Sequence, residues 1–134
     1  MSAMSTYLEN ALVNHVLRNT AYTTPGTTIY VGLIKYYDAA VVEAGTLTQE
    51  ASGGSYARVQ VTSWDAASNG ATQNTGAITF PTATGDWGGI SGVIISDHAS
   101  AGNVLLHGSL TSARDVKNGD GFKFNAGDLD VTFA

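Results

Sequence analysis

The chain has 134 residues, a formal net charge of −5 and no cysteine. This length suits a single domain, residues 1–134, with one ordinary hydrophobic core. The lack of cysteine excludes disulfides, thiolate metal ligands and a cysteine nucleophile. The six basic residues stand singly, so no nucleic-acid partner is expected, because a phosphate backbone needs clustered lysine and arginine. We also expect no secretory signal and no membrane insertion, since no apolar run is long enough to span a bilayer.

The composition favours strands joined by tight turns. Hydrophobic residues make up 43% of the chain, which suffices for a core, whereas charged residues make up only 13%. The usual charged share is about 25%, and here glycine, serine, threonine and alanine replace it. A surface with so little charge is typical of one that meets another protein, because interface centres are depleted of charged residues.

One helix is predicted near the start, over residues 6–18. Thr6 and Glu9 have the spacing of a capping box, in which a hydroxyl and a carboxylate satisfy the first free amides of a helix. An apolar stripe follows at the helical spacing, and it marks a possible assembly helix. Its residues are Leu8, Leu12 and Val16. Tyr7, Val13 and Leu17 widen this apolar face, so the helix is expected to pack under a sheet or against a neighbouring chain.

From residue 28 to 133 the pattern changes to short β-branched and aromatic runs separated by glycine, asparagine and aspartate turns. The expected strands lie at about 28–36, 56–64, 77–80, 90–96, 104–110, 114–117, 122–124 and 129–133. Residues 37–54 are expected to form a long connection. Turns at this spacing predict a mainly β fold: an antiparallel β-sandwich or jelly-roll-like domain with one N-terminal helix.

No arrangement of polar residues indicates an enzyme, a metal or a cofactor. Of the three histidines, only His98 and His107 could become strand neighbours, and a metal site needs three or four converging ligands. The aspartates near the C-terminal end could bind calcium, but they also suit tight hairpin turns, which is the favoured interpretation. No catalytic, metal or cofactor residues are therefore predicted.

Three aromatic residues offer another kind of site. Large amphipathic rings stack on sugars at binding faces, so Trp64, Trp87 and Tyr56 are candidate carbohydrate contacts. The same positions also suit the edge of a β-sandwich core. A carbohydrate-binding module for host attachment is therefore an alternative function of a different class.

Six segments, taken in order, resemble a family of small phage virion structural proteins that are often labelled tail-fibre or minor tail proteins. They read YVGLIKY (30–36), GGSYARV (53–59), AITFPTA (77–83), DWG (86–88), VLLHGSL (104–110) and FKFNAGDL (122–129). The resemblance covers most of the chain. It implies a non-enzymatic protein on the surface of a virion, and it carries over no catalytic or metal residue.

We expect such a protein, made in the bacterial cytoplasm, to act by self-association and by docking to other virion proteins. A compact domain without shaft repeats favours a capsid decoration, or cement, protein over a tail-fibre or minor tail subunit. A homo-oligomer, preferably a trimer, is expected, because closed symmetry protects exposed strand edges. The expected partners are further copies of the chain and major capsid or tail subunits.

Overall fold

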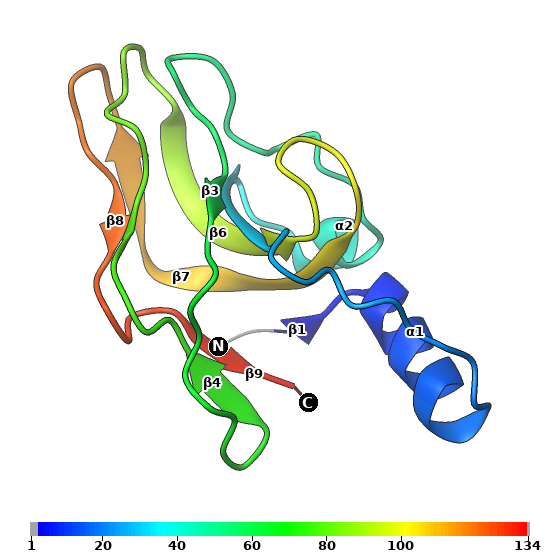
Figure 1. Ribbon diagram of the computed structural model, residues 1–134. Helices are drawn as coiled ribbons and strands as arrows, with labels where there is room; N and C mark the ends of the chain where they lie inside the picture. The colour runs from blue at the N-terminus through cyan, green and yellow to red at the C-terminus, as the bar shows by residue number, and fades with distance from the viewer. Residues whose placement is uncertain (1–2, 134) are drawn as a thin grey trace.

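The centre of the fold is a five-stranded antiparallel sheet. A computed structural model describes residues 3–133 of the chain (Figure 1). In spatial order the sheet contains β1 (Ala3–Met4), β7 (Val104–Val116), β6 (Gly88–Ser96), β2 (Tyr30–Lys35) and β3 (Val59–Gln60). The first strand lies before the helix and pairs with the beginning of β7, at Leu106 and His107, a pairing that the sequence pattern did not indicate.

Two short antiparallel ribbons complete the strand content. One joins β4 (Ala71–Gln73) to β9 (Asp130–Thr132), and the other joins β5 (Ile78–Thr79) to β8 (Lys123–Phe124). Their apolar residues pack into the same cluster as Leu33 of the sheet, so both ribbons cover one of its faces. The predicted mainly β, antiparallel fold with an N-terminal helix is therefore confirmed.

Helix α1 (Thr6–Leu17) starts one residue earlier than the capping pattern indicated. Its N-cap is Ser5, whose hydroxyl accepts a hydrogen bond from the Leu8 amide at 3.2 Å and donates one to the carbonyl of Val104. The Ser5 amide also donates to Leu105 at 2.8 Å. The buried N-cap therefore anchors the first turn of α1 directly to β7.

A second, short helix covers the other face of the sheet. Helix α2 (Ala39–Glu43) lies within the segment that was expected to be a plain connection. The carboxylate of Asp38 caps it by accepting from the Ala40 amide at 3.0 Å. Val42 of α2 is buried in a small cluster with Ile34 and Ile94 of the sheet. Neither helix of the described chain has the length and apolar character that a membrane crossing requires.

Strands β6 and β7 form a long hairpin that bends sharply (Figure 1). The register of the pair shifts between Ile90 and Gly92. Tyr37 packs directly on Gly92, where an added Cβ would lie 2.4 Å from the Tyr37 ring. The phenol of Tyr37 then reaches Nδ1 of the buried His107 at 2.7 Å. This packing fixes the bend from the α2 side of the sheet.

Candidate assembly surface

Helix α1 is divided into an anchored half and an exposed half. Leu8 is 3% exposed and belongs to the main core, and Leu12 packs against that core. Beyond them the helix extends away from the sheet into solvent (Figure 1). Val13, Val16 and Leu17 are 54%, 72% and 78% exposed. These three side chains are called the apolar tip below.

The stripe that the sequence predicted as an assembly helix is therefore divided between two environments. Leu8 holds the helix to the body and is not accessible to a partner. Leu12 is partly buried, whereas Val16 lies open to solvent. Exposed valine and leucine side chains gathered on one helix end are a mark of an interaction surface, because burying them against a partner removes apolar area from water.

An apolar groove of about 280 Å³ runs beside the anchored half of α1. Its walls come from α1, from the segment after the helix and from the β4–β9 ribbon. They include Leu12, Tyr22, Ile29, Trp64, Val131 and Phe133. The polar groups on its lining side chains are the hydroxyl of Thr72, the phenol of Tyr22 and the indole N–H of Trp64. Such a lining has almost no means of binding a polar ligand, but it suits aliphatic side chains.

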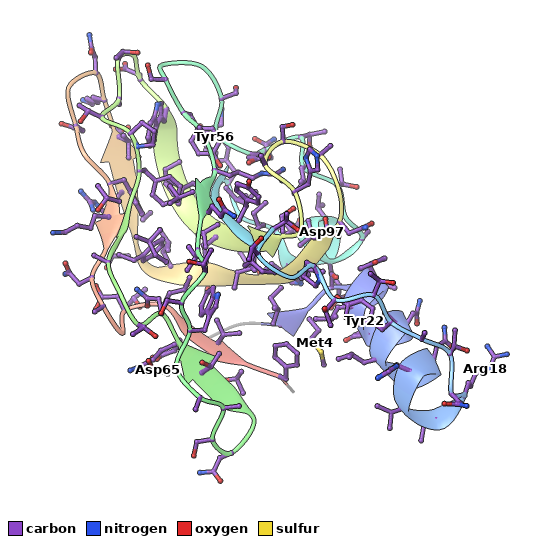
Figure 2. All side chains as sticks on the ribbon, viewed as in Figure 1. Met4, Arg18, Tyr22, Tyr56, Asp65 and Asp97 are labelled. Atoms are coloured by element: carbon purple, nitrogen blue, oxygen red, sulfur yellow. The ribbon has the colours of Figure 1, made fainter. Side chains whose placement is uncertain are left out.

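Two exposed carboxylates, those of Asp65 and Asp130, line a separate shallow pocket together with Thr72 and Gln73. Asp65 follows Trp64 of the apolar groove in the chain, and Asp130 precedes Val131 of that groove. Both aspartates are exposed. Asp65 accepts hydrogen bonds from Gln73 at 2.9 Å and from a threonine hydroxyl at 2.8 Å. Figure 2 places Asp65 beside the β4 ribbon and Tyr22 beside α1, with Arg18 at the far end of the helix.

The three predicted sugar contacts do not form a stacking surface. Trp87 is 2% exposed, and its indole N–H donates to the carbonyl of Gly54 at 2.8 Å. Tyr56 meets the Trp87 ring edge-on, at 5.3 Å between centroids and 82° between planes. Trp64 is elsewhere, half-buried against the core and lining the apolar groove. The buried Trp87 ring has no free face for a sugar, and the partly buried Tyr56 packs against it, so these two rings do not form an exposed platform.

Tyr56 instead belongs to an internal polar network that sequence reasoning missed. Its phenol accepts from the Leu33 amide at 2.9 Å and donates to Glu50 at 2.8 Å. Burial, together with the Glu50 charge, raises the pKa of Tyr56 far above its ordinary value. Arg58 binds both carboxylate oxygens of Glu50 at 2.7 Å. The sequence carried one signal for this network. Arg58 is an isolated charged residue, two positions from Tyr56, in a chain with few charges.

The histidines and aspartates take structural positions. His98 does not lie across a strand pair from His107: its ring accepts backbone amides of the loop that joins β6 to β7, whereas His107 lies on β7 opposite Ile94. Asp120 and Asp128 each accept the backbone amide three residues earlier, as tight turns require. Within residues 3–133, no group of three or more histidine, aspartate or glutamate side chains is placed to hold a metal ion.

Comparison with known proteins gives one clear result. A search of curated proteins finds no match. The model of one protein family, described as podophage GP4 fiber I protein gp80, matches residues 3–132. This match covers the core sheet, both ribbons, both helices and the residues of the apolar groove except Phe133. The resemblance to small, tail-fibre-like phage virion proteins is therefore confirmed, and the chain belongs to the family of the podophage GP4 fiber I protein gp80.

Proposed function

We propose that the chain is a subunit of a fibre-type appendage on a podophage particle, and that it acts by binding further copies of itself and a neighbouring virion protein. The family places the chain among phage structural proteins. The observation that supports the finer role is the match of residues 3–132 to the model of a family described as a fibre protein. A role in the virion, with no enzymatic activity, follows from this proposal.

The molecular surface supports an assembly role. The apolar tip of α1 lies in solvent next to a groove that is apolar along nearly all of its lining. A protein that remained alone would leave both features in contact with water, at a cost set by the apolar area that they expose. Many copies in one appendage also combine weak single contacts into firm attachment.

Capsid decoration is the second candidate function. It is favoured by the form of the described region, a sheet with two covering ribbons and no elongated shaft among residues 3–133. The two functions share the mechanism of self-association and docking, and they differ in the virion protein to which the subunit attaches. A tail or adaptor protein would be the partner in a fibre, and the major capsid protein would be the partner in decoration.

Imaging of the intact particle tests the proposal. Antibody fragments against the purified chain are added to phage particles, which are then examined by electron microscopy. Label on the tail is expected. Label on the capsid lattice would replace the fibre role by decoration, and particles without label and without the chain by mass spectrometry would contradict a virion role altogether.

A further inference from the structure

We propose that a groove between the bent part of β7 and the chain from β8 to β9 binds a neutral saccharide. The groove holds about 360 Å³, which lies within the usual range of small-molecule sites. Its exposed lining residues, called the polar rim below, include Thr111, Ser112, Arg114, Lys123, Asp128 and Asp130. Its buried lining residues, called the floor, include Val93, Leu106, Phe124 and Leu129. A ligand of this kind goes beyond the proposed assembly role, because no association between protein chains requires it.

Strand β7 loses its regular pairing along this groove. Its register with β6 passes from Ser109 to Arg114 while β6 advances by two residues, so residues 110–113 lie opposite Ser91 alone. Strand β1 pairs only with the beginning of β7. Within the described chain, residues 110–113 therefore have no register partner on either side. A bulge of this kind re-aims side chains and often lies next to a functional site, and here it brings Thr111 and Ser112 to the polar rim.

The same bulge makes an added β-strand a poor occupant of the groove. A docking strand needs a regular ladder of free backbone N–H and C=O groups along the receiving edge. Bulges and charged side chains interrupt such an edge, and β7 has both, since Arg114 and Asp115 directly follow residues 110–113. The side chains of the polar rim, and not the backbone of β7, therefore offer the main hydrogen bonds of this groove.

The polar rim carries no net charge. Arg114 and Lys123 bring two positive charges, and Asp128 and Asp130 bring two negative ones, although Asp130 also lines the shallow pocket beside β4. The ion pairs found among residues 3–133 involve none of these four side chains, so their charges are available to a ligand. An anion would require an excess of positive charge, and a cation an excess of negative charge. A rim that is balanced between the two signs therefore selects a neutral ligand.

The polar rim offers hydrogen bonds in both directions. Guanidinium and ammonium groups only donate, carboxylates only accept, and the hydroxyls of Thr111 and Ser112 do either. A saccharide matches such a set because each of its hydroxyls both donates and accepts. The C–H groups on the face of its ring need apolar contact, which the floor supplies. The apolar groove beside α1, whose lining side chains carry few polar groups, has no such rim.

Two groups of the polar rim are held in position by the protein itself. The Arg114 guanidinium lies 4.9 Å from the centroid of the Phe122 ring and donates to the Gly121 carbonyl at 3.4 Å. One carboxylate oxygen of Asp128 accepts a hydrogen bond from the Asn125 amide at 2.9 Å. Groups that are fixed in this way lose little freedom when a ligand binds, which favours affinity.

NMR titration of the isotope-labelled full chain tests the site. Tryptophan fluorescence is unsuitable, because neither Trp64 nor Trp87 lines the groove. The probes are short neutral oligosaccharides of glucose, galactose, mannose and N-acetylglucosamine. At millimolar concentrations, at least one of them is expected to shift the backbone amide signals of residues 109–114 and 122–130 in a saturable way, while the signals of α1 stay in place. No saturable shift from any of these saccharides, or shifts outside the groove, would overturn the proposal.

A blocking variant separates the groove from the rest of the surface. Ser112→Trp places a large ring in the groove and is expected to weaken binding of the best saccharide about tenfold or more. The matched control is Ser52→Trp, since Ser52 is also exposed and does not line the groove. Both variants are expected to keep the melting temperature of the wild type, because neither replaces a buried side chain. Equal affinity of the two variants for the saccharide would show that the groove is not the site.

A neutral replacement tests the polar rim. Asp130→Asn removes a charged acceptor and is expected to weaken saccharide binding roughly threefold to tenfold. Asp115→Asn changes an exposed aspartate outside the groove and is expected to leave the affinity unchanged. If the two variants bind the saccharide equally well, the carboxylate of the polar rim does not hold the ligand.

Two further probes determine the class of ligand. A short uronic acid oligosaccharide represents an anion, and an acetylated, amidated tetrapeptide of glycine, serine and threonine represents a neutral peptide. Both are expected to bind more weakly than the best neutral saccharide. Equal or tighter binding of either probe would overturn the neutral saccharide as the ligand. None of these results affects the imaging test, so a failure of this site is distinguishable from a failure of the virion role.

Discussion

Arg58 binds Glu50 through two parallel hydrogen bonds of 2.7 Å, and the arginine side chain is only 2% exposed. Its remaining terminal nitrogen donates to the carbonyls of His98 and Ala101 at 2.8 and 3.1 Å and to the Ser96 hydroxyl at 3.0 Å. One buried guanidinium therefore ties the end of β6 and the loop that follows it to the segment before β3. It is the main polar link of the interior.

Removing one member of this pair is expected to destabilise the fold severely. Glu50→Gln leaves the buried Arg58 charge without its counter-charge, and the loss in unfolding free energy is expected to be about 3–5 kcal/mol. Denaturant titration measures it. The matched control is the exposed pair of Asp115 and Lys117, 3.7 Å apart, where Asp115→Asn should cost less than about 1 kcal/mol. Equal losses in the two variants would contradict a structural role for the Arg58 pair.

The bend of the β6–β7 hairpin depends on Gly92. An added Cβ at Gly92 would lie 2.4 Å from the Tyr37 ring, whereas Gly89, on the same strand, has nothing within 4 Å of that position. Gly92→Ala is expected to lower the unfolding free energy by about 1–3 kcal/mol through overpacking, and Gly89→Ala should leave it nearly unchanged. Thermal unfolding followed by circular dichroism compares them. If Gly92→Ala left the unfolding free energy unchanged, the contact of Tyr37 with Gly92 would not be what fixes the bend.

His107 makes stability depend on pH. Burial lowers the pKa of this histidine below its ordinary value of about 6.5, and in the described chain its Nε2 lacks a hydrogen-bond partner. The unfolded chain therefore binds a proton at a higher pH than the folded chain does. The contribution of neutral His107 is complete above about pH 6.5 and is lost as the pH falls toward the folded pKa.

The melting temperature of the wild-type chain is accordingly expected to fall between pH 7 and pH 5. His107→Gln should reduce this dependence, although it also lowers the melting temperature at pH 7 because the contact with Tyr37 changes. His15→Gln alters an exposed histidine and should preserve the full dependence. An identical pH profile for the wild type and His107→Gln would exclude His107 as the responsible group.

Trp87 is expected to behave as a core residue. Trp87→Phe loses the hydrogen bond to Gly54 and leaves a void beside Tyr56, so the unfolding free energy should fall by about 1–3 kcal/mol. Soluble host polysaccharide should not shift the fluorescence of Trp87, which the Trp64→Phe variant isolates. A saturable shift in that variant would contradict the interior position of the ring.

Local patterns predicted α1 and most of the strands, because hydrophobic period and turn residues are local signals. They did not indicate β1 or β4, and they divided β7 into two strands. They missed the N-cap by one residue, because Ser5 is held in place by a hydrogen bond to the carbonyl of Val104, which lies 99 positions away in the chain. They also extended the expected strand at 56–64 too far: only Val59–Gln60 pairs as a strand, because Arg58 and Tyr56 turn inward to Glu50. The lone Arg58 near Tyr56 signalled a polar network but not its partner, because hydrophobic periodicity does not report side-chain hydrogen bonds.

The candidate site was predictable only in part. The apolar stripe from Leu8 to Val16 indicated an assembly helix, but not where the helix leaves the body of the protein. The groove could not be foreseen, because Trp64 and Phe133 meet α1 only through the pairing of β4 with β9. Trp87 and Tyr56 were candidates for an exposed surface because the sequence alone does not distinguish an aromatic ring in a core from one on a binding face.

A reconstruction of the phage particle by electron cryomicroscopy, with the chain fitted into the density, tests the account most directly. The account predicts several copies in one appendage, with the exposed end of α1 in each copy covered by a neighbouring protein chain. Copies that stand apart on the particle, with α1 surrounded by solvent, would contradict assembly through this helix.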